Sequence, residues 1–186
     1  MASRAPFRLV LAVLVRSAFV LVLVGAGLGF SGESADAARG RASAGLAREI
    51  LALQAAGRIR IADYSELRSA DQTDRSLASQ QLKDIAAGRR ATLSRRCFRT
   101  PHAPVRADVR LLRFLVALGL RAHYTLNVLF GQCHVRTSMH YRGMAVDFRC
   151  GMATRTADAI GARYGVRRNY ETCRSNRHWH YSVGGR

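Results

Sequence analysis

The chain has 186 residues, enough for one ordinary domain and a leader, and its formal net charge is +18. Almost all of the positive charge comes from arginine, because Lys83 is the only lysine. A field of this sign favours nucleic acid, acidic lipid or acidic cell-wall polymers over cationic partners, and charge alone does not choose among the three.

The N-terminus has the three-part layout of a secretory signal. Arg4 and Arg8 give a positive start, a mostly apolar run covers residues 9–30, and small and polar residues lead to an A-D-A sequence that ends at Ala37. We therefore expect residues 1–37 to be a signal peptide. A retained N-terminal membrane anchor is the alternative, because the apolar run is long enough to span a bilayer although Arg16 interrupts it. In both cases the rest of the chain is secreted or otherwise extracytoplasmic, in the cell wall or periplasm, which argues against nucleic acid as a partner.

Residues 38–99 predict a helical N-terminal region. Residues 38–45 are small and polar and indicate a disordered segment. Apolar side chains recur at helical spacing over residues 46–56 and again over residues 73–87, and a glycine follows each stretch. Two helices are therefore expected here, and their exposed arginines are most simply a solvated surface.

Residues 100–186 have the pattern of a small domain with both helices and strands. Helices are expected over residues 109–118 and 153–164. Stretches with β-branched and aromatic residues predict strands, at residues 124–130, 144–148, 166–170 and 178–183. Helices packed against a small, mostly antiparallel sheet make an α+β fold.

Four cysteines lie in the part of the chain that would be oxidised after export: Cys97, Cys133, Cys150 and Cys173. Two disulfide bonds are the expected outcome, and four cysteines allow three pairings. No C-x-x-C spacing is present, so a zinc site built from cysteines is rejected. The sequence leaves the pairing open.

Four polar side chains are expected to converge on one face of the sheet. Alternate residues of a strand share a face, so His178 and His180 point the same way in the last strand. Asp147 points away from the apolar face of its own strand, and the turn at Gly143 lets His140 fold back over it. If the two strands are neighbours, the three histidines and the aspartate meet.

Two imidazoles and one carboxylate around an open fourth position form the ligand set of a catalytic zinc ion. Zinc lowers the pKa of a bound water to about 7 and so supplies a nucleophile without a serine or cysteine. The remaining histidine can then serve as general base and acid.

The residues involved also resemble a known family. The pattern S-x-H-x-x-G-x-A-x-D followed by H-x-H near the C-terminus is similar to that of the zinc D-Ala-D-Ala carboxypeptidases, which are related in fold to lysostaphin-type endopeptidases and to the hedgehog signalling domain. The matching positions are Ser138, His140, Gly143, Ala145, Asp147, His178 and His180. The resemblance covers about residues 105–183 and implies a hedgehog/DD-peptidase-like fold for this region.

The resemblance implies a role for each of these positions. His140, Asp147 and His180 would bind Zn²⁺, and His178 would be the catalytic histidine beside the metal. Some relatives carry a catalytic glutamate three residues before the last histidine ligand, but this chain has Arg177 there. The role of base therefore falls to His178.

Three further residues have weaker assignments. Glu171 is the only nearby carboxylate that could replace His178 as base. Arg136 is the candidate for the arginine that such enzymes use upstream of the first motif, to polarise the scissile carbonyl or to hold a substrate carboxylate. Ser138 is expected to hydrogen-bond within the site or to substrate rather than to act as a nucleophile.

Plainer interpretations exist for each residue taken singly. His140 and Asp147 could be a hydrogen-bonded pair, and His178 and His180 could be surface residues that flank a buried Trp179. The remaining histidines match no motif and are assigned structural or surface roles: His102, His123 and His134. Tyr141 and Tyr181 either line the cleft or pack as aromatic residues. The joint occurrence of both motifs favours the metal site.

The sequence therefore predicts a monomeric, exported zinc peptidase that hydrolyses D-Ala-type bonds in the stem peptides of peptidoglycan. Its basic surface would suit anionic cell-wall polymers. Whether it is a carboxypeptidase or an endopeptidase stays open. The alternatives are a zinc-containing wall-binding module without activity, and an exported cationic binder of nucleic acid or lipid.

Overall fold

The computed structural model describes residues 34–63, 75–94, 103–131, 133–169, 173 and 178–184. The chain divides into two units, Met1–Gly32 and Glu33–Arg186, and every described residue belongs to the second. The leader expected over residues 1–37 lies almost entirely outside the described residues and stays a prediction. Within the described part of the chain, no helix is both long and apolar enough to cross a membrane.

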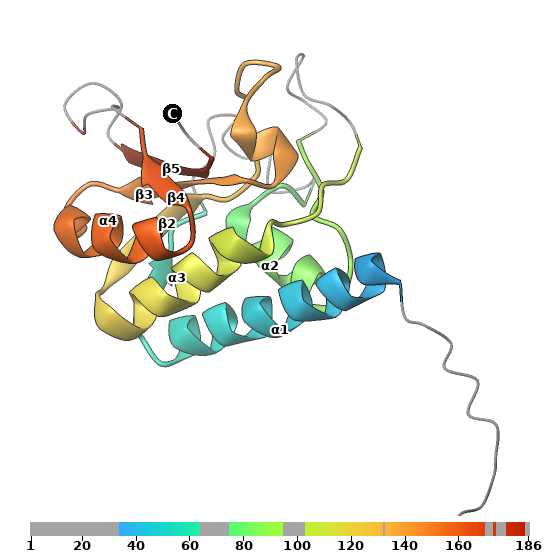
Figure 1. The fold of residues 1–186 in the computed structure, drawn as a ribbon, viewed down its shortest axis with the longest axis horizontal. Helices are drawn as coiled ribbons and strands as arrows, with labels where there is room; N and C mark the ends of the chain where they lie inside the picture. Colours follow the sequence, from blue (N-terminus) through green and yellow to red (C-terminus); the bar gives the residue numbers. More distant parts are fainter. Residues whose placement is uncertain are drawn as a thin grey trace, which may run out of the picture. The chain divides into compact units, whose positions relative to one another are not determined.

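The second unit is an α+β fold (Figure 1). Its elements are α1 (Ala35–Ala55), β1 (Ile59–Ile61), α2 (Ala78–Ala86), α3 (Val109–Arg121), β2 (Tyr124–Val128), the 3-10 helix η2 (Met139–Arg142), β3 (Ala145–Arg149), α4 (Thr154–Arg163), β4 (Val166–Arg168) and β5 (His178–Val183). The strands form one sheet in the order β1-β2-β3-β5-β4, and only the β1–β2 pair is parallel. The predicted fold class, with a mostly antiparallel sheet, is confirmed.

Helix α3 covers one face of this sheet. Its buried residues recur at helical spacing and form one apolar stripe: Leu111, Leu112, Phe114, Leu115 and Leu118. The ring of Phe114 stacks on Tyr181 of β5 at 5.5 Å and meets Phe148 of β3 edge-on at 6.0 Å. This aromatic contact fixes which face of β3 and β5 is apolar, and it leaves the other face for polar side chains.

Helix α3 runs past the end that the sequence predicted. The sequence predicted its end at Gly119, but the helix continues to Arg121. A side chain at residue 119 would come within 2.9 Å of Leu53 and 3.0 Å of Ile59. Gly119 therefore lies where α3 approaches α1 and β1 closely, so that a larger residue would displace the neighbouring side chains, and it does not mark a helix end.

Helix α1 begins earlier than predicted. The prediction of disorder over residues 38–45 is wrong, because α1 is continuous from Ala35 to Ala55. The Ser34 side chain caps its first turn, and Ser43 and Ala44 are buried. Small residues suit this position because α1 packs closely on its neighbours α2 and α3 (Figure 1).

Helix α2 begins later than predicted, at Ala78 rather than near residue 73. Arg75 has a left-handed backbone, with φ of 65°, which a helix does not accommodate. Residues 73 and 74 lie outside the described residues. Arg75 and Arg89 both donate hydrogen bonds to the buried carboxylate of Asp84, so this turn is held by an ion-pair cluster.

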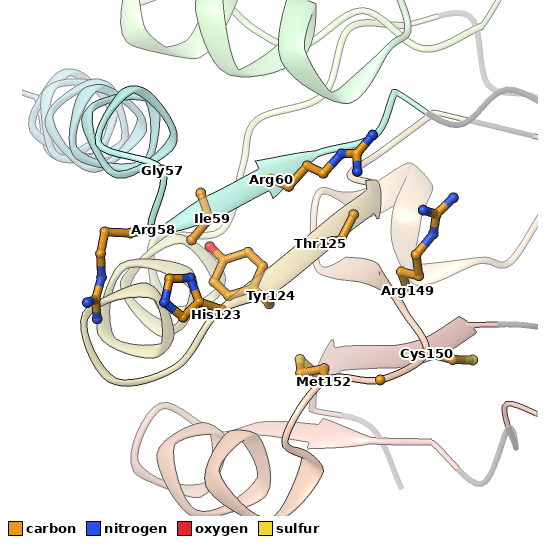
Figure 2. Close-up of a pocket in the computed structure, with 11 residues that line it drawn as sticks. Gly57, Arg58, Ile59, Arg60, His123, Tyr124, Thr125, Arg149, Cys150 and Met152 are labelled. Atoms are coloured by element: carbon orange, nitrogen blue, oxygen red, sulfur yellow. The ribbon is translucent and has the colours of Figure 1, made fainter.

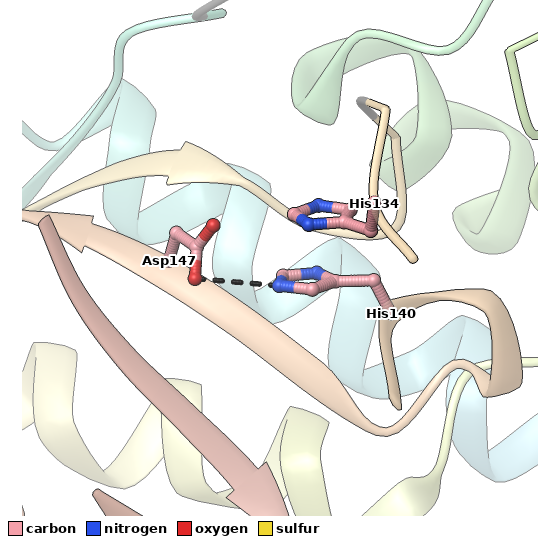
Figure 3. Close-up of side chains that lie close together, drawn as sticks. All are labelled: His134, His140 and Asp147. Atoms are coloured by element: carbon pink, nitrogen blue, oxygen red, sulfur yellow. Dashed lines mark ion pairs between the residues drawn. The ribbon is translucent and has the colours of Figure 1, made fainter. Parts of the chain in front are cut away.

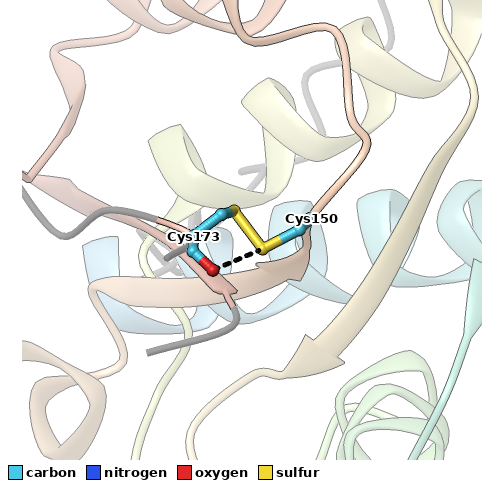
Figure 4. The surroundings of a disulfide bond; sticks show 2 residues. All are labelled: Cys150 and Cys173. Carbon is cyan, nitrogen blue, oxygen red and sulfur yellow. Dashed lines mark hydrogen bonds between the residues drawn. A yellow bond between two sulfur atoms is a disulfide. The ribbon is translucent and has the colours of Figure 1, made fainter. Parts of the chain in front are cut away.

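One disulfide bond braces the end of β3. Cys150 directly follows β3 and is bonded to Cys173, with 5.7 Å between their Cα atoms (Figure 4). Cys133 is also disulfide-bonded, and no cysteine among the described residues is free. Cys97 lies outside the described residues. The expected use of cysteines in disulfides is met, which is compatible with an extracytoplasmic location.

Candidate metal centre

The pairing of β3 with β5 places two of the predicted residues face to face. Asp147 lies directly opposite His180, and Arg149 lies opposite His178. Because side chains alternate along a strand, all four point to the face that α3 does not cover. Asp147 and His180 are both buried, at 2% and 9% exposure.

The 3-10 helix η2 brings His140 to the same place. The Ser138 hydroxyl accepts a hydrogen bond from the His140 backbone N–H at 3.3 Å and caps the helix. Gly143 ends it with φ of 72°, and a Cβ there would meet the carbonyl oxygen of Arg106 at 2.1 Å. Only glycine fits this turn, which returns the chain to β3. His140 is fully buried.

Three ligand-type atoms meet above the sheet. His180 Nδ1 lies 2.9 Å from Asp147 Oδ1 and 3.1 Å from His140 Nε2, and His140 Nε2 lies 3.3 Å from Asp147 Oδ1. A tetrahedral zinc ion with bonds of about 2.0–2.1 Å holds its ligand atoms about 3.3–3.4 Å apart. The triangle therefore has nearly the size that such an ion requires.

The hydrogen bond to Leu129 decides which nitrogen of His140 faces the triangle. The Nδ1 of His140 is 2.6 Å from the Leu129 carbonyl oxygen, and this contact makes it the protonated nitrogen. The Nε2 of neutral His140 then carries a lone pair that faces Asp147, itself an acceptor. A direct hydrogen bond between His140 and Asp147 therefore requires a second proton on His140, whereas a proton on His180 Nδ1 or a metal ion can face both lone pairs.

The carboxyl group of Asp147 is ionised despite its burial. Burial alone raises its pKa, but the neighbouring rings of His140 and His180 outweigh that effect through charge and hydrogen bonds when they are protonated. The pKa of Asp147 therefore lies far below its ordinary value of 3.8. A deprotonated carboxylate is the form that binds metal.

His134 joins this group, although the sequence analysis assigned it a structural or surface role. Its ring stacks on that of His140, with 4.2 Å between centroids and 3° between planes (Figure 3). The hydroxyl of Tyr141 holds the backbone of His134 from both sides: it accepts from the N–H at 2.7 Å and donates to the carbonyl at 3.1 Å. One ligand-type atom from each of His134, His140 and Asp147 lies within 4.8 Å of the others, so this buried group can hold a metal ion.

One ring nitrogen of His134 is left without a partner among the described residues. The side chain hydrogen-bonds to the Gly131 backbone, and its Nε2 is buried without a hydrogen-bond partner among the described residues. Burial and the neighbouring charge of His140 lower the pKa of His134 to about 4, so its ring is neutral at pH 7. A buried nitrogen with a lone pair and no partner is a feature that a metal ion or a polar ligand would satisfy.

The other predicted residues lie at different distances from the centre. His178 is partly exposed, and its Nε2 is 3.8 Å from Asp147 Oδ2, beside the triangle and not in it. Arg136 is exposed in the turn before η2, and no hydrogen bond or ion pair joins it to a described residue. Glu171 and Arg177 lie outside the described residues. The structure thus groups His178 with the centre and leaves the role of Arg136 a prediction.

Tyr141 and Tyr181, which the sequence analysis assigned either to the cleft or to aromatic packing, have different roles in the structure. Tyr181 is fully buried against Phe114 and Phe148, and its hydroxyl donates to Asp158 at 2.8 Å, so it is a packing residue. Tyr141 is part of the centre's support, because it fixes the segment that carries His134. No spacing in the sequence predicts the contact of the Tyr141 hydroxyl with the His134 backbone.

Comparison of the chain with protein-family models, curated proteins and solved structures finds no match in any of the three. The resemblance to the zinc D-Ala-D-Ala carboxypeptidases therefore depends on the two motifs alone.

Proposed function

We propose that the protein is a zinc-dependent peptidase that hydrolyses D-Ala-type bonds in peptidoglycan stem peptides. The observation that carries the proposal is the triangle of His140 Nε2, Asp147 Oδ1 and His180 Nδ1, with edges of 2.9 to 3.3 Å. Zinc is the proposed metal because two imidazoles and one carboxylate form its usual catalytic ligand set. The substrate class comes from the motif resemblance.

Each residue around the triangle would have its own role in hydrolysis. A zinc ion, when bound, acidifies a water molecule and polarises a carbonyl oxygen. His178 is close to Asp147 but partly open to solvent, so it can accept a proton during attack and return it to the leaving amine. The Leu129 carbonyl keeps His140 in the tautomer that turns Nε2 toward the centre. Neutral His134 stacks on His140 and limits its rotation.

Location and charge support the same proposal. The Cys150–Cys173 bond is of the kind that persists in an oxidising compartment, and the N-terminal sequence predicts export. The net charge of +18 would hold the protein near anionic cell-wall polymers. Peptidoglycan is accessible in that compartment, whereas nucleic acid is not expected there.

Digestion of defined muropeptides tests the proposal. The purified chain, with and without a chelator, is incubated with stem peptides, and the products are identified by mass. We expect cleavage that the chelator abolishes and zinc restores. The mass of the product also separates loss of a terminal D-Ala from cleavage of a cross-link.

A His178→Ala variant separates an enzyme from an inactive wall-binding module. It should keep its zinc and lose about 10²–10⁴-fold in rate, because only proton transfer is removed. His123→Ala is the matched control for zinc content, since His123 is exposed and lies outside the metal group. A wild-type chain that holds zinc and cleaves none of the muropeptides would make the binding module the better conclusion.

A further inference from the structure

A second polar site lies on the sheet near the metal centre. It is a cavity of about 270 Å³ between β1, β2 and the turn that follows β3 (Figure 2). Its lining includes Arg58, Arg60, Arg149 and His123, and none of the described residues that line it is an aspartate or glutamate. A pocket with three guanidinium groups and no counter-charge favours an anionic ligand.

Two of the arginines stand in one row across the sheet. Arg60 of β1 pairs with Thr125 of β2, and one step from the Leu126–Phe148 pair places Thr125 opposite Arg149 of β3. Figure 2 shows the Arg60 and Arg149 side chains extending from either side of Thr125. Neighbouring strands lie about 4.8 Å apart, and β2 separates β1 from β3. The backbones at Arg60 and Arg149 are therefore about 10 Å apart, and both side chains can reach one small anion.

These two arginines have no ion-pair partner in the part of the chain that the structure describes. Arg58 is engaged, because it donates to the carbonyl oxygens of Gly119 and Leu120. Arg60 and Arg149 are exposed and form no hydrogen bond or ion pair with any described residue. Some other surface arginines are paired with a carboxylate, as Arg168 is with Asp158 at 2.8 Å. The row of Arg60, Thr125 and Arg149 therefore presents positive charge and a hydroxyl, with no partner for the charge among the described residues.

The row continues into the metal centre. Arg149 lies opposite His178, and Asp147 is two residues before Arg149 on the same face of β3. Two residues of a strand span about 6.6–6.8 Å, so the row is offset from the metal triangle by that distance. An extended peptide lying on this face would cover the same distance with two residues. Because an arginine side chain is long, the group that it binds can be about three residues from the metal centre.

We propose that Arg60 and Arg149 form a carboxylate-binding subsite that selects peptides with an acidic group two to three residues from the scissile bond. This inference rests on the proposed peptidase function, because it treats the metal centre as the point of cleavage. A carboxylate fits two guanidinium groups through paired hydrogen bonds. A substrate peptide is favoured over a wall phosphate, because Arg149 of the row and Asp147 of the triangle lie on the same face of β3 and a single extended chain can reach both.

Binding of matched peptides tests the subsite apart from catalysis. The zinc-loaded full chain is titrated calorimetrically with a short peptide that contains one glutamate and with the same peptide carrying glutamine. We expect the acidic peptide to bind the wild type about tenfold more tightly, which is the effect of about 1.4 kcal/mol from a charged hydrogen bond. The Arg60→Gln/Arg149→Gln variant should lose this preference, and the Arg155→Gln/Arg163→Gln variant, with the same change in charge on α4, should keep it.

Kinetics with peptides that carry the glutamate one to four residues from the scissile bond supply the second test. The preferred position should be two or three, and the Arg60→Gln/Arg149→Gln variant should raise KM about tenfold with kcat unchanged. Equal binding of the two peptides to the wild type, or an unchanged preference in the double arginine variant, would overturn the subsite. Displacement of the acidic peptide by inorganic phosphate at millimolar concentration, with no glutamate preference, would instead assign the pocket to phosphate and refute the carboxylate.

The two proposals can fail separately. An intact glutamate preference in a chain that cleaves nothing would contradict the peptidase function and leave an anion-binding pocket. Cleavage that ignores the glutamate would leave the peptidase and contradict the subsite.

Discussion

Replacement of Asp147 by asparagine is the sharpest single perturbation of the metal centre. The side chain keeps its volume and can still accept a hydrogen bond from His180 Nδ1, which lies 2.9 Å away. The change removes the one negative charge that faces His140 and His180. Metal binding should therefore be lost while the fold is retained.

The size of the effect follows from linkage between binding and folding. Free zinc at about 1,000 times its dissociation constant stabilises the folded wild type by about 4 kcal/mol. For a domain of this size, that corresponds to a rise in Tm of about 8–16 °C. Asp147→Asn should show almost none of this rise, because the remaining two imidazoles form an incomplete and uncharged ligand set.

Thermal unfolding of both proteins, with zinc and with chelator, measures the difference. Asp158→Asn is the matched control: Asp158 holds Arg168 and the Tyr181 hydroxyl, so this variant should lose stability but keep the zinc-dependent rise. A wild type whose Tm does not respond to zinc would refute the metal centre. So would an Asp147→Asn variant that responds like the wild type.

Three further predictions concern the support of the site and the fold. His134→Ala should weaken zinc binding about tenfold in a competition assay with a chelator. His134→Phe keeps the stacked ring but has no ring nitrogen. It should weaken zinc binding as much as alanine does if the nitrogen matters, and not at all if only the stacking matters. Joint replacement of Cys150 and Cys173 by serine should lower the free energy of unfolding by about 3 kcal/mol, since the bond closes a loop with a sequence separation of 23; an unchanged denaturation midpoint would contradict this. Burial alone raises the pKa of Asp84, but hydrogen bonds from two arginines lower it below 3.8. Asp84→Asn should therefore destabilise the chain by about 2 kcal/mol at pH 7. This difference from the wild type should shrink below about pH 4, as Asp84 is protonated first in the unfolded chain and, at lower pH, in the folded wild type. Urea unfolding at several pH values checks the direction, and a difference that grows toward acid pH would be inconsistent with it.

The convergence of His140, Asp147 and His180 could be predicted because it depends on local rules. Alternation along a strand fixes the face of Asp147 and of both residues of the H-x-H motif. Gly143 marks the turn that returns His140 to that face. The pairing of β3 with β5 was the one long-range assumption, and the structure confirms it.

His134 could not be found in the same way. It belongs to no motif. Its position depends on two hydrogen bonds between its backbone and the hydroxyl of Tyr141, seven residues further along the chain. Its unpartnered Nε2 is visible only in three dimensions.

Other differences arise from contacts between distant segments. β1 has only three residues, and its parallel pairing joins Ile59 to Tyr124, a partner that no local pattern names. The sequence predicted disorder at the start of α1 because the residues there are small and polar, with few large apolar side chains. Their burial beneath neighbouring helices is a tertiary effect. The row of Arg60 and Arg149 likewise depends on register across β1, β2 and β3.

The central claim is that one metal ion joins His140, Asp147 and His180. Metal analysis of the purified full chain by mass spectrometry, together with zinc X-ray absorption spectroscopy, tests it most directly. The account predicts one zinc per chain, bound through imidazole nitrogen and carboxylate oxygen at about 2.0–2.2 Å, and its loss in His180→Ala but not in His123→Ala. A wild-type chain without stoichiometric metal, or a zinc held by sulfur, would contradict it.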